Sequence, residues 1–245
     1  MRKVFSKPKS LKSVVFSYCP GCGHGIVHRL VAECIDELKL RESTIAVAPV
    51  GCAVFTSDYF NFDITEAPHG RAPAVATGIK RTNYDKFVFT YQGDGDIAAI
   101  GIAEIIHAAN RSENITVIFV NNANYGMTGG QMAPTTLIGQ VTKTTPFGRD
   151  PKKEGYPIKL CEILAILEGT TYLERVSIHN PLNIVKAKQA IKKAFQCQIN
   201  KMGFSMVEIL SSCPTDWSMT PIEAIKWIDE KFIKCFPLGM IKNKL

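Results

Sequence analysis

The sequence predicts an α/β protein with a mostly parallel sheet flanked by helices. Apolar strand-like runs alternate with helical runs over most of the chain, and one strand–helix–strand unit is complete within residues 86–120. The second strand of that unit, 115–120, is a continuous apolar run. Such runs are typical of parallel strands covered on both faces, and the alternation is typical of α/β domains.

Before this unit, the chain starts with little periodicity and then shows apolar residues at helical spacing, followed by a short β-type run. A stretch rich in aromatic and turn residues comes next. The predicted order is an N-terminal arm (1–18), a helix (26–38), a strand (44–48), a loop (57–71) and a short helix (72–80).

The central unit consists of a strand (86–92), a helix that is apolar on nearly every side (97–110) and the apolar strand 115–120. A long segment rich in glycine and proline (121–157) follows, and such a segment inside a compact domain is usually functional. The alternation then resumes with a helix (158–167), a strand (171–177), a helix (181–197), a strand (205–210) and a last helix (221–232). We therefore expect one domain at 19–235 and a C-terminal tail at 236–245.

Composition places the chain among ordinary globular proteins, with 245 residues, 46% hydrophobic and 21% charged. No apolar run reaches the roughly 18 residues that cross a bilayer, and the basic start lacks the apolar segment of a secretion signal. We therefore expect a cytoplasmic protein without membrane association. Its eight cysteines then suggest reduced thiols or metal ligands.

The formal net charge is +7, from 29 basic and 22 acidic residues. This charge fits either steering of an acidic partner, such as a small electron carrier, or a lysine-rich solvated surface. The scattered lysines favour the surface interpretation. No basic helix or aromatic-interleaved stripe indicates nucleic acid binding.

Polar residues follow two neighbouring strands of the central unit. Gly93-Asp94-Gly95-Asp96 comes after the first strand, and Asn121-Asn122 comes after the second. Ligands of open parallel sheets bind at the carboxyl ends of strands, and the next helix points its N-terminus at the same place. Asp94 and Asn122 supply the oxygen ligands that Mg²⁺ prefers beside phosphates. Gly-Asp-Gly alone is more often a simple turn, but its placement here favours a magnesium–diphosphate site.

Two cysteines three apart, Cys19 and Cys22, can direct both sulfurs at one centre. Zinc, an iron–sulfur cluster and a thioredoxin-like redox disulfide all fit this spacing. Four other cysteines lie in or at the ends of apolar helical stretches and are expected in the core: Cys34, Cys161, Cys197 and Cys235. Cys52 and Cys213 differ, because each follows a strand and stands next to glycine or proline.

In combination, these motifs resemble thiamine diphosphate enzymes, and within them the beta subunit of 2-oxoacid:ferredoxin oxidoreductases. The resemblance rests on Gly93-Asp94-Gly95 with Asn121-Asn122, on the continuation Tyr125 to Gln131 with Pro134-Thr135, and on three further motifs. These are Cys19-Pro20-Gly21-Cys22-Gly23, His69-Gly70-Arg71 and Ser212-Cys213-Pro214-Thr215. It covers nearly the whole chain and implies a single thiamine diphosphate-binding domain.

The resemblance also implies roles for individual residues. Asp94, the Asn122 side chain and the Asn124 main-chain carbonyl would be Mg²⁺ ligands, with Gly95 and Asp96 on the diphosphate. Further residues expected to approach thiamine diphosphate are Gly51, Cys52, Ala53, His69, Gly126 and Met127. Four cysteines match those that hold a [4Fe–4S] cluster: Cys19, Cys22, Cys52 and Cys213. No catalytic side chain of this chain is implied.

The implied reaction is oxidative decarboxylation of a 2-oxoacid, with coenzyme A and ferredoxin as co-substrates. Thiamine enzymes also need a glutamate against the aminopyrimidine ring, normally on a separate domain for which this chain has no room. Glu66 and Glu104 are better interpreted as loop and helix residues. We therefore expect an alpha subunit that brings this glutamate and the coenzyme A site, a hetero-oligomer that can include gamma and delta subunits, and no turnover by the chain alone.

Substrate choice is indicated only by a cluster of aromatic residues after Cys52: Phe55, Tyr59, Phe60 and Phe62. Some relatives carry lysine where Phe55 stands, and an apolar side chain favours a branched or aromatic 2-oxoacid over a dicarboxylate. The tract around 48–55 is most similar to 2-ketoisovalerate oxidoreductases, with pyruvate and 2-oxoglutarate as alternatives. Core or interface packing explains the same aromatics equally well.

Two other classes compete with this interpretation. A non-oxidative thiamine enzyme, such as a decarboxylase or synthase subunit, would keep Asp94 and Asn122 but has no use for four cluster cysteines. A zinc-stabilised binding module would explain Cys19 and Cys22 but not the spacing from Gly-Asp-Gly to Asn-Asn. The combination of motifs favours the oxidoreductase subunit over both.

Overall fold

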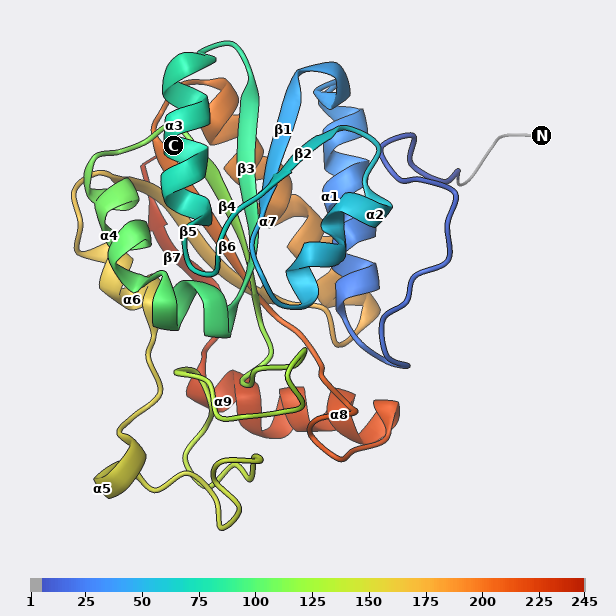
Figure 1. Cartoon of the computed structure of the whole chain (residues 1–245), viewed down its shortest axis with the longest axis vertical. Coiled ribbons are helices and arrows are strands. Elements are labelled where there is room, and N and C mark those ends of the chain that lie inside the picture. Colours follow the sequence, from blue (N-terminus) through green and yellow to red (C-terminus); the bar gives the residue numbers. More distant parts are fainter. Residues whose placement is uncertain (1–5, 245) are drawn as a thin grey trace.

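A twisted sheet forms the centre of the molecule in the computed structural model, which describes residues 6–244 (Figure 1). The described sheet has seven strands in the order β2-β1-β3-β4-β6-β5-β7, parallel except for β7, which runs antiparallel to β5. The strands are β1 (Thr44–Ala48), β2 (Asp63–Glu66), β3 (Phe87–Gly93), β4 (Thr116–Asn121), β5 (Thr170–Ser177), β6 (Phe204–Leu210) and β7 (Gly239–Asn243).

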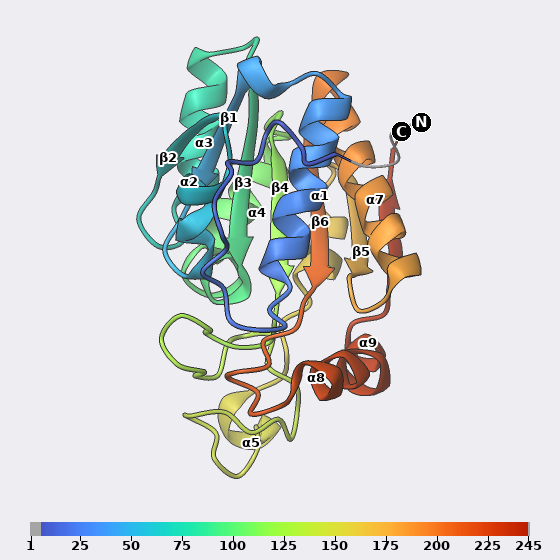
Figure 2. The ribbon, with the colours of Figure 1, turned by 90° about the vertical axis from the view of Figure 1, so that its right-hand side faces the viewer.

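Helices cover both faces of this sheet (Figures 1 and 2). On one face α1 (His24–Glu37) packs against α7 (Pro181–Ile199), and α7 contacts β4, β5 and β6. The other face carries α3 (Ala72–Thr82), α4 (Ile102–Asn110) and α6 (Leu160–Ala165). Each face has its own buried apolar core, so the predicted α/β architecture with a mostly parallel, helix-flanked sheet is confirmed.

The helix starts follow from local sequence. The Asn180 side chain caps α7 by accepting the Asn183 N–H, and Pro181 occupies the first helical position. Thr220 and Glu223 form a capping box at the start of α8 (Pro221–Trp227). That helix continues through η4 (Ile228–Phe232) into α9 (Ile233–Cys235).

Two predicted elements differ from the structure. The stretch 57–71, predicted as loop, contains the end of α2 (Thr56–Tyr59) and the edge strand β2, which has only four residues, none of them buried, and therefore lacks the pattern of a strand. The continuous helix predicted at 97–110 is instead a π-helical turn, η3 (Asp96–Ile100), followed by α4. Gly101 separates the two. The residue at this position must be small, because a Cβ there would lie 2.7 Å from the Gly70 carbonyl oxygen.

The ends of the chain also differ from expectation. The predicted tail 236–245 contains β7, which pairs with β5 and extends the sheet. In the predicted arm, residues 1–5 lie outside the described residues, but Leu11 forms a β-bridge with Phe60. Short isolated pairings of this kind leave no periodic pattern in the sequence. None of the described helices is long and apolar enough to cross a membrane.

Beyond the carboxyl ends of the strands lie the long segment after β4 and the helices α8, η4 and α9 (Figures 1 and 2). A third apolar cluster, which includes Leu210, Trp217 and Phe232, packs these helices against the strand ends. The long segment contains one helical turn, α5 (Pro151–Glu154). Arg149 is 4% exposed and donates to five main-chain carbonyls of this segment: those of Pro134, Thr136, Glu154, Gly155 and Tyr156. The segment is therefore ordered, although it has little regular structure.

Candidate functional site

A cavity opens at the carboxyl ends of the central strands, where five chain segments meet. It lies between the segments after β1, β2, β3 and β4 and the start of α1. Its lining includes all the residues expected around the cofactor: Gly51, Cys52, Ala53, His69, Asp94, Gly95, Asp96, Asn122, Asn124, Gly126 and Met127. The structure thus brings this set together from segments that are distant in the sequence.

Asp94 lies at the floor of the cavity, directly after β3. Its carboxylate is buried and accepts hydrogen bonds from the Thr135 hydroxyl at 2.6 Å and the Gly95 N–H at 2.8 Å. Burial raises the pKa of Asp94 to about 7, and these hydrogen bonds only partly oppose that effect. A carboxylate whose charge costs this much in isolation is well suited to pair with a cation.

Oxygen atoms of Asn122 and Asn124 face Asp94. The oxygen position of the Asn122 amide lies 2.8 Å from the main-chain oxygen of Asn124, 3.1 Å from its side-chain oxygen and 3.2 Å from Oδ1 of Asp94. No proton donor stands between these oxygens in that arrangement. Either the amide is turned so that its nitrogen takes the position, or a cation lies among the oxygens. This donor set fits Mg²⁺.

The backbone around the asparagines is held in an unusual shape. Ala123, between them, has φ 59°, which non-glycine residues rarely adopt. The Trp217 indole donates to the Asn122 carbonyl at 3.0 Å, and the Asn121 side chain accepts the Ala123 N–H. Asn121 in turn donates to the buried Glu208 at 2.7 Å. The turn after β4 is therefore held by hydrogen bonds to Trp217 on one side and to Glu208 of β6 on the other.

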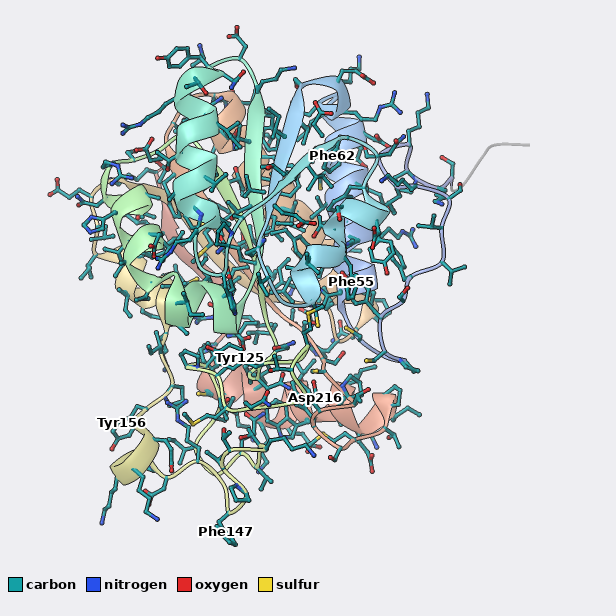
Figure 3. The ribbon with its side chains drawn as sticks, viewed as in Figure 1. Phe55, Phe62, Tyr125, Phe147, Tyr156 and Asp216 are labelled. Atoms are coloured by element: carbon teal, nitrogen blue, oxygen red, sulfur yellow. The ribbon has the colours of Figure 1, made fainter. Side chains whose placement is uncertain are left out.

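Gly95 provides room for an aromatic ring. A Cβ at Gly95 would lie 2.2 Å from the Tyr125 ring. The ring can therefore pack against the main chain of residue 95 only because Gly95 has no side chain. Tyr125 begins a tight turn that returns at Gln131, where the two form an isolated β-bridge. Gly126 and Met127 in this turn line the cavity, and Figure 3 shows Tyr125 close to the ends of the strands.

Asp96 has a different environment from the one expected for a residue on a diphosphate. Its carboxylate is buried and accepts three hydrogen bonds, from His69 Nδ1 at 2.5 Å, the Gly70 N–H at 2.6 Å and Gln92 Nε2 at 2.6 Å. The carboxylate is thus engaged in holding His69. Only the main chain of Asp96, at the start of η3, remains for a phosphate.

The Cys19–Cys22 segment docks against the segment that carries Cys213. The Ser212 hydroxyl donates to the Gly21 carbonyl at 2.7 Å, and Gly21 has φ 77°. A Cβ at Gly21 would meet Pro221 at 2.7 Å, so this approach requires glycine. These contacts place three of the four expected cluster cysteines at one end of the molecule.

Cys52 lies between this cysteine group and the cavity. A Cβ at Gly126 would stand 3.5 Å from the Cys52 sulfur and 3.5 Å from Oδ2 of Asp216, which accepts a hydrogen bond from Cys213 at 3.3 Å. Figure 3 shows sulfur atoms between Phe55 and Asp216. Burial raises the pKa of Cys22 to about 12 and that of Cys52 to about 11. Metal binding would therefore have to displace thiol protons.

Within residues 6–244, no group of three or more His, Cys, Asp or Glu side chains is close enough to hold a single metal ion. Of the remaining cysteines, Cys34, Cys161 and Cys197 are buried in the core as expected, and Cys235 is half-buried.

The aromatic cluster after Cys52 does not line the cavity of this chain. Tyr59 and Phe60 are buried, and the Phe60 ring stacks on Phe62 with centroids 4.8 Å apart. Packing in the core therefore explains these three. Phe55 is half-buried beside Tyr18, at the end of the molecule that carries the cavity, whereas Phe62 lies farther away along β2 (Figure 3).

Several residues of the site were given no role by the sequence analysis. Thr135 contacts Asp94, Gln92 holds Asp96, and His24 lines the cavity with its Nδ1 2.9 Å from the Tyr91 hydroxyl. Arg175 and Glu208 form a buried ion pair at 2.7 Å behind Asn121. The sequence contains one indication of this pair: Arg175 and Glu208 are charged residues within the apolar strands β5 and β6.

Comparison with known proteins places the chain in a family. Residues 49–209 match the thiamine pyrophosphate enzyme C-terminal TPP binding domain. The chain is 47% identical to ketoisovalerate oxidoreductase subunit VorA of Methanothermobacter thermautotrophicus over 99% of its length and 53% of the relative's. It is 40% identical to 2-oxoglutarate synthase subunit KorB of Methanocaldococcus jannaschii, over 88% of this chain and 78% of that one. The chain belongs to the 2-oxoacid oxidoreductase subunits that carry the thiamine pyrophosphate-binding domain.

A solved structure supports the same family. The 2-oxoglutarate:ferredoxin oxidoreductase from Magnetococcus marinus, with 2-oxoglutarate, coenzyme A and succinyl-CoA bound, is 27% identical with a TM-score of 0.81, covering 98% of this chain and 86% of that one. The chain spans about half the length of its ketoisovalerate oxidoreductase relative. Within the family, therefore, relatives carry both ketoisovalerate and 2-oxoglutarate in their names.

Proposed function

We propose that the chain is the beta subunit of a 2-oxoacid:ferredoxin oxidoreductase, which converts a 2-oxoacid to acyl-CoA and carbon dioxide and passes the electrons to ferredoxin. One observation carries the proposal most: the Asn122 amide lies within 3.2 Å of the Asp94 carboxylate and of both oxygens of Asn124, beside the cavity. Cys52 connects that cavity to the group of thiols. A metal–diphosphate site and a redox site next to each other suit this reaction.

Different residues of the chain would bind the metal ion, the thiamine diphosphate and the cluster. Asp94 and Asn122, with the Asn124 carbonyl, would hold Mg²⁺, and the residues around Gly51, Gly95, Gly126 and Met127 would bind thiamine diphosphate. Cys19, Cys22, Cys52 and Cys213 would hold a [4Fe–4S] cluster. When bound, the thiamine group supplies a nucleophilic carbon and an electron sink, and the cluster supplies a one-electron acceptor.

The best-supported substrate is 2-ketoisovalerate or a similar branched 2-oxoacid, because the ketoisovalerate relative has the higher identity of the two compared. Phe55 is the residue of this chain that we assign to substrate choice. Pyruvate and 2-oxoglutarate are the alternatives. Replacing Phe55 with lysine and comparing the three substrates tests the assignment, and an unchanged preference would remove Phe55 from it.

The proposed partner subunit would supply a group that the cavity lining does not contain. The cavity contains no glutamate among its lining residues within the described chain, so a separate alpha subunit would bring the pyrimidine-binding glutamate and the coenzyme A site. Ferredoxin would accept the electrons, and gamma or delta subunits would carry any further clusters. We expect the purified chain alone to show no 2-oxoacid-dependent reduction of a viologen dye, with activity restored by adding the alpha subunit.

The decisive experiment is anaerobic co-purification of the chain with its partner subunits. Iron, acid-labile sulfide and bound thiamine diphosphate are measured, together with coenzyme A-dependent reduction of ferredoxin. Loss of iron in a Cys213→Ser variant that keeps its thiamine would assign the cluster to this chain. Thiamine without iron in the native complex would contradict the proposal and favour a non-oxidative thiamine enzyme.

A further inference from the structure

One part of the long segment after β4 extends away from the rest of the molecule. Residues 138–156, called the arm below, lie beyond the carboxyl ends of the strands and include α5 (Figures 1 and 2). The arm exposes four large apolar side chains, two of them aromatic: Ile138, Val141, Phe147 and Tyr156. Figure 3 shows Phe147 and Tyr156 pointing away from the body of the protein. Exposed apolar side chains gathered on one element are typical of an interaction surface.

Phe147 is fully exposed although the main chain around it is fixed. The turn that carries it is closed at its base, where Ile138 and Arg149 form a β-bridge and the Gly139 N–H donates to the Arg149 carbonyl at 2.9 Å. Gly148, next to Phe147, has φ 89°, and a Cβ on it would lie 2.7 Å from the Gly139 carbonyl oxygen. A partner that covers Phe147 therefore has little main-chain freedom to remove, which favours tight binding.

The exposed surface of the arm is basic. The arm contains four basic and two acidic residues, and both carboxylates are used within it. Asp150 Oδ1 accepts the Lys152 N–H at 2.9 Å, and Glu154 Oε2 accepts the Asp150 N–H at 2.6 Å. The exposed lysines Lys143, Lys152 and Lys153 form no ion pair with any residue in the range 6–244. The surface that fits the arm is therefore apolar at its centre and acidic around it.

These charges distinguish between two kinds of partner. In a dimer formed through the arm, each copy of the chain would bring the same excess of cations and no free carboxylate, so like charges would be placed together. A different chain with an acidic surface avoids this repulsion and pairs with the lysines. The arm is therefore suited to a partner subunit rather than to a second copy of this chain.

The base of the arm is joined to the wall of the cavity. The Lys143 N–H donates to the Gly130 carbonyl at 2.9 Å, and the Met132 N–H donates to the Thr144 hydroxyl oxygen at 3.0 Å. Gly130 belongs to the same tight turn as Met127, which lines the cavity. A partner on the arm is thus next to the cavity, where the function proposed above requires a group from the alpha subunit.

We propose that the arm is the element through which this chain binds the alpha subunit, with Phe147 and Tyr156 covered by an apolar and acidic surface of that subunit. The aromatic side chains supply the central contacts, and the lysines of the arm attract the acidic surface and speed association. The proposal rests on the function proposed above and adds the surface that holds the two subunits together.

A double variant, Phe147→Ser with Tyr156→Ser, tests the aromatic contacts. The matched control is Tyr84→Ser, because Tyr84 and Tyr156 are both 75% exposed but Tyr84 precedes β3, at the end of the strands opposite the cavity. Each anaerobically purified complex is diluted in steps, and the dissociation constant for the two subunits is measured by sedimentation velocity. We expect the double variant to raise this constant by about 10-fold or more. The control should change it by less than about 2-fold.

A second pair of variants tests the charges. Lys152→Glu with Lys153→Glu should slow association of the subunits, and the difference should be largest at low salt. The control changes two exposed lysines of α7, Lys186→Glu with Lys193→Glu, and has the same net charge. Because the control should associate nearly as fast as the wild type, the comparison separates the position of the charges from their number.

Limited proteolysis locates the contact. Phe147 is followed by Gly148, so chymotrypsin can cleave the bond between them in the free chain. We expect this bond to be protected in the complex with the alpha subunit. Equally fast cleavage in the free chain and in the complex would overturn the inference.

Two other results would also overturn it. One is an unchanged dissociation constant in Phe147→Ser with Tyr156→Ser. The other is a dimer of the free chain in which the same bond is protected, because the arm would then bind a second copy. In each of these cases the wild-type complex still contains thiamine diphosphate and oxidises a 2-oxoacid. A failure of the proposed function is different, since the wild-type complex itself would then lack the cofactor or the activity.

Discussion

Gly95 shows how strongly a single residue can shape the cavity. The Tyr125 ring occupies the space that any side chain at Gly95 would need, whereas a Cβ at Gly93, two residues earlier, would meet nothing within 4 Å. Neither glycine has the positive φ that only glycine tolerates easily. The two therefore differ in packing rather than in backbone conformation, which makes them a matched pair.

We expect Gly95→Ala to lower the free energy of unfolding by about 1–3 kcal/mol, because the methyl group must displace Tyr125. Gly93→Ala should change it by less than about 0.5 kcal/mol beyond the general effect of alanine in a strand end. Urea unfolding of the cofactor-free proteins measures both. Equal losses in the two variants would show that Tyr125 moves aside without cost.

At the scale of elements, a buried ion network joins three strands of the sheet to α6 and to the segment before β7. Arg175 on β5 is 1% exposed and donates to Glu208 on β6 at 2.7 Å and to Glu162 on α6 at 2.6 Å. Glu208 also accepts from Asn121 at the end of β4, and Arg175 donates to the Pro237 carbonyl just before β7. The network thus links the site's asparagine turn to the edge of the sheet.

Replacing Arg175 with methionine should destabilise the fold by about 3–5 kcal/mol, since it leaves the Glu208 carboxylate buried without its cation. Adding Glu208→Gln removes the stranded charge but keeps an acceptor for Asn121, so the double variant should recover part of the loss. Denaturant unfolding of the two variants is the measurement. A double variant less stable than Arg175→Met alone would contradict this explanation.

The long segment after β4 depends on Arg149 in a similar way. One guanidinium donates to five carbonyls from two separate stretches of the segment, whereas a lysine ammonium has only three N–H donors. Phe147 is 100% exposed and is followed by Gly148, so the bond after Phe147 is a chymotrypsin site. Arg149→Lys should therefore be cleaved faster in this segment, while an exposed control, Lys152→Arg, should be cleaved as slowly as the wild type.

For the molecule as a whole, buried histidines link stability to pH. His28 on α1 lies in the core, with its Nδ1 3.0 Å from the hydroxyl of Tyr91 on β3. Burial lowers the pKa of His28 well below the ordinary value. The unfolded chain takes up a proton at His28 below about pH 6.5, whereas the folded chain does not. Protonation therefore favours unfolding, and this part of the stability is lost as the pH falls below about 6.5.

We expect each such histidine to add a slope of up to about 1.4 kcal/mol per pH unit to the free energy of unfolding between pH 6 and 5. His28→Asn keeps a partner for Tyr91 and should flatten this slope, even though the smaller side chain lowers stability overall. Asparagine at the exposed His107 should leave the slope as it is. Unfolding curves at several pH values decide, and an unchanged slope in His28→Asn would refute the assignment.

The sequence by itself determined the α/β class, the strands next to the cavity and the grouping of Asp94 with Asn122, because apolar runs and glycine-framed turns are local signals. It also suggests Cys52 and Cys213 as partners of Cys19 and Cys22, which stays a prediction. Edge strands were missed, since β2 and β7 are short and half-exposed and only pairing with a neighbour makes them strands.

Only the tertiary structure decided which side chains act on one another across the strand ends. The Asp96 carboxylate holds His69, which lies 27 residues away in the sequence, and the place of Asp96 on the diphosphate stays a prediction. Gln92, Thr135 and Arg175 were given no role from the sequence, because the role of a buried polar residue becomes recognisable only when its partner is known. Hydrogen bonds and ion pairs between distant segments leave no periodicity, and these contacts define the environment in which the site's residues work.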